Sequence, residues 1–212
     1  CWTTLKERLD NTSSQIVFAQ ETGITAAMQG DATTWASARN WPFLHSPARE
    51  GLAGTTSCGV AIFVRKELGL RWPPGSGPGG TPLPSEPQHG VLCPGRLVAA
   101  VIDVPGWEPL VAVCGYHPEG QALTQEYLDI LATMGTFLAD ADLFVVAADW
   151  NLQQEVLEGT GLARRLGGLL AFPPQATCVM SAASSTIDGF LCSNKFAKLV
   201  AQPTADMTWP PR

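Results

Sequence analysis

Asp149 and Asn151 are the residues of this sequence whose types and spacing most readily point to chemistry. They follow the apolar residues 143–148, which predict a buried strand. Residues two apart in an extended strand face the same way, so the carboxylate and the amide would lie together at the strand's mouth. A polar pair in that position is a usual place for chemistry. On this stretch alone, an Asx-type turn that closes the strand is the more frequent interpretation.

Three further polar residues lie on or at the ends of predicted strands. Glu21 follows the strand predicted over 15–20, and Tyr116 leaves the strand predicted over 109–115. Asp188 lies inside another apolar run. A carboxylate in an apolar strand is costly unless it is paired or coordinated, so Asp188 is more informative than a surface aspartate. A solvated glutamate and a packed tyrosine remain open interpretations of the other two positions.

The elements that must position these residues alternate between strands and helices. Period-2 and apolar runs predict strands over 15–20, 58–64, 97–104, 109–115, 143–149, 177–180 and 186–192. Helical spacing predicts helices over 5–9, 25–38, 121–139, 153–158 and 161–167. Strand pairs interrupted by helices predict a layered α/β domain with mixed sheets, not a simple doubly wound one.

The predicted organisation is a single domain over residues 1–212. Residues 72–95 contain seven Pro and six Gly, which predicts a long surface loop without regular elements. The strands on either side of it, 58–64 and 97–104, are expected to pair as a hairpin. Residues 45–57 are small and polar, and they predict a further loop.

Composition and charge limit the classes of function. Hydrophobic residues make up 45% of the chain, enough for a sizeable core, and the net charge of −6 excludes a basic footprint for nucleic acid. An anionic substrate would therefore need a bound divalent cation. No apolar run reaches the roughly 18 residues of a membrane span. The cysteines lack C-x-x-C spacing and are interpreted as free thiols, which predicts an intracellular location, nuclear or cytoplasmic.

Taken in order, the five polar residues at four predicted strands resemble the motifs of the endonuclease/exonuclease/phosphatase superfamily. The matching stretches are Gln20-Glu21, Cys114 to Pro118, Ala148 to Asn151 and Ile187 to Phe190. The resemblance spans roughly residues 16–199, and it implies a four-layer α/β sandwich with two mixed β-sheets. Within the superfamily, the sequence is most similar to the apurinic-endonuclease-type domain of non-LTR retrotransposons, including versions carried in dinoflagellate genomes.

The resemblance also implies a role for each residue. Glu21 would ligate Mg²⁺, with Mn²⁺ as a possible substitute. Asp149 would orient or deprotonate the attacking water, and Asn151 would hold that water or the scissile phosphate. Tyr116 would contact the phosphate, and Asp188 would pair with a catalytic histidine. In-line attack on a phosphodiester needs exactly such charge neutralisation and a positioned water.

The implied function is that of a magnesium-dependent phosphodiesterase, specifically the DNA endonuclease domain of a retrotransposon. The full-length parent protein would bind DNA. Its oligomeric state stays open. Two alternatives remain: a decayed module that binds nucleic acid or protein without turnover, and a phosphatase or sphingomyelinase-like enzyme acting on a small phosphoester.

The sequence departs from the family pattern in three ways. The family's first strand, which carries an Asn near the metal, would precede Cys1. No histidine follows His117, so Asp188 lacks its usual partner, and Thr186 stands where an Arg often occurs. We therefore expect a chain that is truncated at both ends and weak or inactive by itself.

Overall fold

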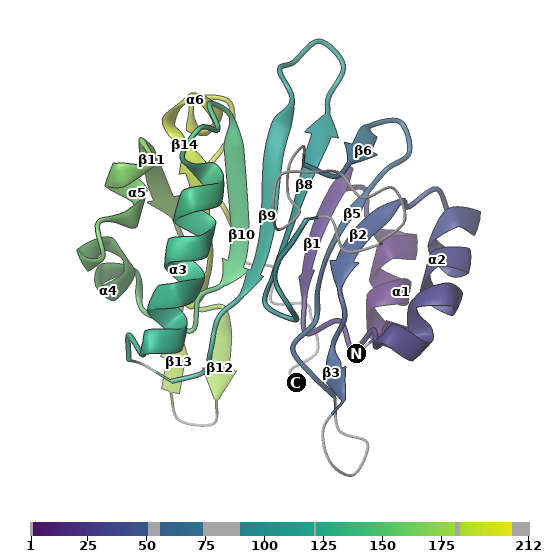
Figure 1. Cartoon of the computed structure of the whole chain (residues 1–212), viewed down its shortest axis with the longest axis horizontal. Coiled ribbons are helices and arrows are strands. Elements are labelled where there is room, and N and C mark those ends of the chain that lie inside the picture. Colours follow the sequence, from purple (N-terminus) through teal and green to yellow (C-terminus); the bar gives the residue numbers. More distant parts are fainter. Residues whose placement is uncertain (1, 51–55, 74–89, 121, 181–182, 205–212) are drawn as a thin grey trace. The chain divides into compact units, whose positions relative to one another are not determined.

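The computed structural model describes residues 2–50, 56–73, 90–120, 122–180 and 183–204. They fall into two compact units, Cys1–Tyr116 and His117–Arg212. The described residues include a three-stranded sheet and a seven-stranded sheet, which are accompanied by helices (Figure 1). The predicted α/β class with two sheets is therefore confirmed.

The first unit contains most of the strands. Its elements are α1 (Trp2–Asn11), β1 (Ile16–Gln20), the 3-10 helix η1 (Ala26–Met28), α2 (Gln29–Ala38), β2 (Phe43–Ser46), β3 (Arg49–Glu50), β4 (Thr56–Ser57), β5 (Val60–Val64), β6 (Gly69–Arg71), β7 (Val91–Cys93), β8 (Leu97–Asp103) and β9 (Leu110–Tyr116). β5 lies between β1 and β2, and β8 pairs with β9 on one edge and with β6 and β7 on the other. All these ladders are antiparallel.

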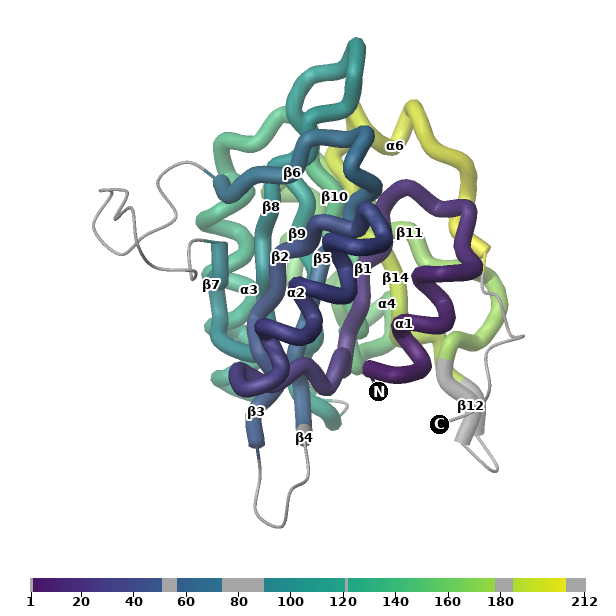
Figure 2. The backbone as a smooth tube through the Cα atoms, turned by 90° about the vertical axis from the view of Figure 1, so that its right-hand side faces the viewer, coloured from purple at the N-terminus to yellow at the C-terminus, as the bar shows by residue number. Residues whose placement is uncertain are grey.

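An apolar cluster joins α1 and α2 to the three-stranded sheet. β5 is an unbroken apolar run whose five residues are all buried, as expected for a strand covered on both faces. Trp2, Leu9 and Trp41 pack with Phe63 of β5 in this cluster. α1 and α2 lie on one side of the three-stranded sheet (Figure 2). The Trp41 ring nitrogen donates to the Leu9 carbonyl at 3.1 Å, so the large indole is buried without losing its hydrogen bond.

Three sequence predictions for this unit are wrong. Residues 45–57 were expected to form a loop, but they include the end of β2 and the short strands β3 and β4. The strands 58–64 and 97–104 do not pair, because β5 and β8 lie in different sheets. Of the predicted loop 72–95, residues 74–89 lie outside the described part of the chain, and the remainder contains β7. β3 and β4 pair with each other, and β7 pairs with the adjacent β8, so short hairpins form in stretches whose polar or Pro- and Gly-rich composition predicted loops.

The second unit alternates helices and strands. Its elements are α3 (Gln125–Leu138), β10 (Phe144–Asp149), α4 (Gln154–Gly159), α5 (Leu162–Arg165), β11 (Gly168–Ala171), β12 (Cys178–Met180), β13 (Ala183–Ser185), β14 (Asp188–Ser193) and α6 (Asn194–Ala197). β14 lies between β10 and β11, and both pairings are antiparallel. β12 and β13 form a separate hairpin.

β10 and α3 follow directly from the sequence pattern. All six residues of β10 are buried, as the apolar run predicts. α3 buries Tyr127, Ile130, Leu131, Met134 and Leu138, which recur at three- and four-residue spacing. Among the described residues, no helix has both the length and the apolar character needed to cross a membrane.

Candidate active site

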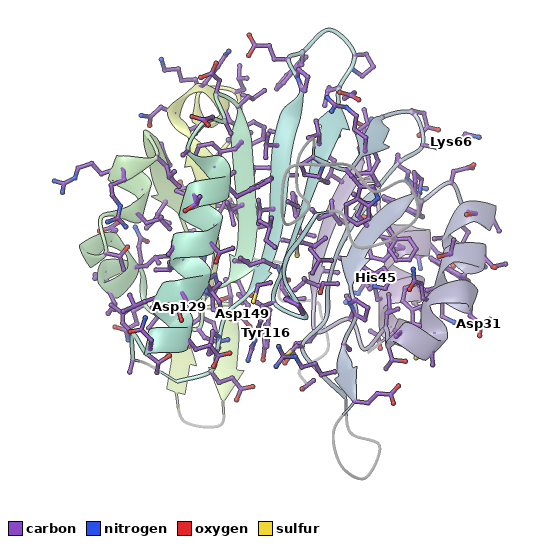
Figure 3. The ribbon with its side chains drawn as sticks, viewed as in Figure 1. Asp31, His45, Lys66, Tyr116, Asp129 and Asp149 are labelled. Atoms are coloured by element: carbon purple, nitrogen blue, oxygen red, sulfur yellow. The ribbon has the colours of Figure 1, made fainter. Side chains whose placement is uncertain are left out.

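In the first unit, Glu21 and Tyr116 meet at the ends of two strands. β1 ends at Gln20, and Glu21 has a φ of 48°, so the chain turns out of the strand at this residue. Tyr116 is the last residue of β9 (Figure 3). Its hydroxyl donates to Glu21 Oε1 at 2.8 Å, although the two residues are 95 positions apart. A hydrogen bond to a carboxylate is stronger than one between neutral groups, so this contact fixes both side chains.

Cys114 links the strands that carry this pair. Its thiol donates to the Ala19 carbonyl at 3.5 Å and accepts from the Gln20 side-chain amide at 3.6 Å. Burial raises the pKa of the Cys114 thiol to about 12, so the thiol stays protonated and keeps its donor at neutral pH. The contacts lie two residues before Tyr116 and directly before Glu21, and they therefore support the same hydrogen bond.

Arg96 contributes a positive charge that was not predicted. Its guanidinium carbon lies 5.2 Å from the centroid of the Tyr116 ring, within cation–π range. The backbone N–H of Tyr116 donates to the Arg96 carbonyl at 2.8 Å. The site thus has a local cation despite the acidic net charge. A single Arg before a strand gives no signal in sequence, because only the pairing of β8 with β9 brings it to Tyr116.

In the second unit, Asp149 and Asp188 are direct partners across two strands. Asp149 ends β10, Asp188 begins β14, and the register pairs them. Directly opposed residues of an antiparallel pair point to the same face, so two carboxylates share it. Thr177 Oγ1 accepts from the backbone N–H groups of Ile187 and Asp188, both at 3.0 Å, and holds the start of β14. A cation or a proton offsets the repulsion between such like charges.

Asn151 is placed by a turn and not by an extended strand. Its φ is 49°, and its backbone N–H donates to Asp149 Oδ1 at 3.1 Å, which is an Asx turn. The expectation that the backbone stays extended from Asp149 to Asn151 is therefore wrong. The side-chain Nδ2 of Asn151 donates to the His117 carbonyl at 2.9 Å. The Asx turn and a functional Asp149–Asn151 pair are thus compatible interpretations, because the turn orients the Asn151 amide.

The His117 ring stacks with two other rings next to this turn. Its centroid is 4.7 Å from that of Tyr127 and 4.9 Å from that of Trp150, both in stacked geometry. The backbone N–H of His117 donates to the Asp149 carbonyl at 3.0 Å. The Tyr127 hydroxyl donates to the Trp150 carbonyl at 2.7 Å. Burial and then the charge of Asp149 raise the pKa of Tyr127 well above its ordinary value, so the hydroxyl remains a donor.

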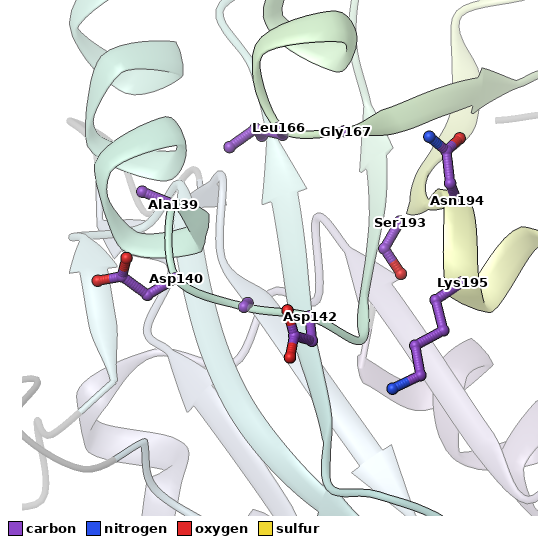
Figure 4. Close-up of a pocket in the computed structure, with 9 residues that line it drawn as sticks. Ala139, Asp140, Asp142, Leu166, Gly167, Ser193, Asn194 and Lys195 are labelled. Atoms are coloured by element: carbon purple, nitrogen blue, oxygen red, sulfur yellow. The ribbon is translucent and has the colours of Figure 1, made fainter.

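The strand-end residues Asp149 and Asp188 do not line the pocket found in the second unit. This pocket of about 740 Å³ is lined by Asp140, Asp142, Ser193 and Lys195, among others (Figure 4). Residues 139–142 precede β10, so the pocket lies at the opposite end of that strand from Asp149.

Glu21 is the residue of the first-unit pair whose side chain could ligate a metal ion. Within the described ranges, no three His, Cys, Asp or Glu residues come together in a way that could hold a metal. Zinc sites normally need three or four such ligands, whereas Mg²⁺ keeps several waters and needs only one or two carboxylates. The Glu21 carboxylate offers oxygen donors of the right kind. Such oxygen donors are compatible with a hard divalent cation.

No protein-family model and no curated protein matches this chain. Solved structures do match. AP endonuclease LMAP from Leishmania major aligns with 94% of this chain and 76% of its own at 13% identity and a TM-score of 0.68. The endonuclease domain of TRAS1, a telomere-specific non-LTR retrotransposon, aligns over 93% and 81% at 15% identity and a TM-score of 0.58. An AP endonuclease from Archaeoglobus fulgidus aligns over 93% and 83% at 15% identity and a TM-score of 0.57. At such identities the likeness concerns the fold, and this chain has the endonuclease/exonuclease/phosphatase fold.

Proposed function

We propose that this chain is a metal-dependent phosphoester hydrolase that cleaves DNA, and that it derives from the endonuclease domain of a non-LTR retrotransposon. The observation that carries the proposal is the 2.8 Å hydrogen bond from the Tyr116 hydroxyl to Glu21. This hydrogen bond brings together a phenol and a carboxylate, each at the end of a strand. Support for the DNA substrate comes from the matched structures, which include AP endonucleases and a retrotransposon endonuclease domain.

In the first unit, the proposed task is to hold the phosphate. The Glu21 carboxylate would hold the metal ion, Mg²⁺ or Mn²⁺, which when bound supplies Lewis-acid polarisation of a phosphoryl oxygen. Tyr116 would donate its hydroxyl hydrogen bond to a phosphate oxygen when substrate is bound. Arg96, whose guanidinium lies beside the Tyr116 ring, would supply positive charge for the phosphate. A net charge of −6 makes such local cations necessary for an anionic substrate.

In the second unit, the proposed task is to position and deprotonate water. Asp149 is 5% exposed and would accept the proton of the attacking water. Asn151 uses one N–H of its side-chain amide for the His117 carbonyl, which turns the rest of the amide in a fixed direction to hold that water. The Asp188 carboxylate lies opposite Asp149, so a proton taken up between them would offset the repulsion of their like charges.

The proposal is tested by comparing substrates with the same protein. Wild-type chain is incubated with supercoiled plasmid DNA, with a phosphomonoester and with a phosphoinositide headgroup, each in Mg²⁺ and in EDTA. We expect slow nicking of the plasmid in Mg²⁺ and none in EDTA. The two small substrates should show little turnover in either condition.

Each other outcome contradicts the proposal in a distinct way. Turnover of the small phosphoesters without nicking would assign a phosphatase. Binding of DNA without turnover in any metal would assign a non-catalytic binding module.

A further inference from the structure

His117 is embedded in a stack of three rings in the second unit. Its side chain is fully buried, and the rings of Tyr127 and Trp150 both stack with it, at centroid distances of 4.7 and 4.9 Å. The interplanar angles are 28° and 21°, so both neighbours lie nearly parallel to the imidazole. Offset stacking of this kind restricts how far the imidazole ring can shift or rotate.

The stack is closed by hydrogen bonds at its outer members. The Tyr127 hydroxyl donates to the Trp150 carbonyl at 2.7 Å, and the Trp150 ring nitrogen donates to the Gly189 carbonyl at 3.2 Å. Tyr127 belongs to the first turn of α3, whereas Gly189 belongs to β14. The three rings are therefore fastened to a helix and to a strand, and not only to each other.

The backbone of His117 holds both polar residues of the adjoining turn. Its N–H donates to the Asp149 carbonyl at 3.0 Å, and its carbonyl accepts from Asn151 Nδ2 at 2.9 Å. Trp150, one of the stacked rings, lies between Asp149 and Asn151 in sequence. A displacement of His117 would therefore move the carboxylate-bearing strand end and the amide together.

We propose that His117 is a positioning residue: its ring, stacked with Tyr127 and Trp150, fixes the places of Asp149 and Asn151. This role rests on the function proposed above. The imidazole itself is completely buried, so it acts through its neighbours and does not touch substrate. Misplacement of catalytic groups by about 1 Å is known to cost about a hundredfold in rate, which sets the scale of the expected effect.

The test compares His117→Ala, which removes the ring, with His117→Phe, which keeps a ring in the stack. Two quantities are measured: kcat and KM for plasmid nicking, and hydrogen exchange of the Asn151 Nδ2 protons by NMR, assigned with Asn151→Asp. For the alanine variant we expect kcat to fall about tenfold or more with KM within about twofold, and the amide protons to exchange about tenfold faster. The phenylalanine variant should restore both to within about threefold of wild type.

His45→Ala is the matched control, because His45 is also a buried histidine but lies on β2 in the first unit. It should leave kcat and Asn151 exchange unchanged. If His117→Ala does not fold, His117→Leu provides a ringless side chain of closer volume. Wild-type exchange in a folded ringless variant, or a phenylalanine variant as impaired as the alanine one, would overturn the proposal. The exchange measurement needs no activity, so a wild-type chain without turnover would refute the proposed function and still decide the role of His117.

Discussion

At the scale of single residues, Glu21 and Asn151 share an unusual backbone conformation. Only four non-glycine residues in the described part of the chain have positive φ, and these two, at 48° and 49°, are among them. This conformation costs non-glycine residues roughly 1 kcal/mol or more. The Tyr116 hydroxyl binds the side chain of Glu21, and the Asx turn holds Asn151. Strain held in place by specific hydrogen bonds is typical of functional positions.

The burial of His45 leads us to expect that the protein loses stability in acid. Its side chain is buried, its Nδ1 has no hydrogen-bond partner among the described residues, and burial lowers its pKa from the ordinary value of 6.5. The unfolded chain therefore binds this proton first as the pH falls. The free energy of unfolding should decline below about pH 6.5, with a slope of up to about 1.4 kcal/mol per pH unit from this one group.

Urea denaturation between pH 7.5 and about pH 5 measures this slope. His45→Phe keeps a ring beside Phe43, whose ring centroid lies 5.2 Å from that of His45 in a tilted arrangement, but it removes the titrating group. The difference in slope between wild type and variant gives the contribution of His45 to the pH dependence, separate from that of the carboxylates. Identical slopes would show that protonation of His45 does not lower the protein's free energy of unfolding.

At the scale of elements, α3 fixes the ring that begins the three-ring stack. Thr124 is its N-cap, and its hydroxyl accepts from the Tyr127 backbone N–H at 3.2 Å. Thr124→Ala should lower the free energy of unfolding by about 1 kcal/mol, because a first-turn N–H loses its side-chain partner. Chemical denaturation monitored by circular dichroism gives this value.

Thr133→Ala is the control on the same helix. Its hydroxyl donates to the Asp129 carbonyl at 2.8 Å within the exposed middle of α3, a contact that adds little to helix stability. The change should therefore be near zero or slightly stabilising. Equal losses in the two variants would mean that the cap has no special role.

The elements also show where sequence reasoning succeeds. β10 and α3 were predicted because each carries its pattern within one segment: an apolar run, and apolar residues at three- and four-residue spacing. The full extent of β2 was not predicted, because His45 and Ser46 are polar residues that are buried in the strand. Their burial depends on pairing with Ala61 and Val60 of β5. A strand that owes its existence to a distant partner leaves no local pattern.

At the scale of the whole molecule, the order of the motifs carried more information than any one of them. Neither Glu21 nor Tyr116 was distinctive alone, and the contact between them spans 95 positions of sequence. Only the motif set in chain order predicted the fold, which the solved structures then matched. Arg96 and His117 were not predicted as site residues. Arg96 lies outside the motifs, and His117 occupies a position in the Cys114 to Pro118 stretch to which the resemblance gives no role; packing sets the neighbours of both.

The most direct test of the hydrolase function is plasmid nicking in Mg²⁺ by wild type, Asp149→Asn and Asp129→Asn. Asp149→Asn keeps an oxygen for the Asx turn but cannot accept a proton, whereas Asp129 is exposed on α3 and serves as a matched control (Figure 3). The account predicts nicking by wild type and Asp129→Asn, and a loss of about a hundredfold or more in Asp149→Asn. Equal nicking by all three proteins would contradict it.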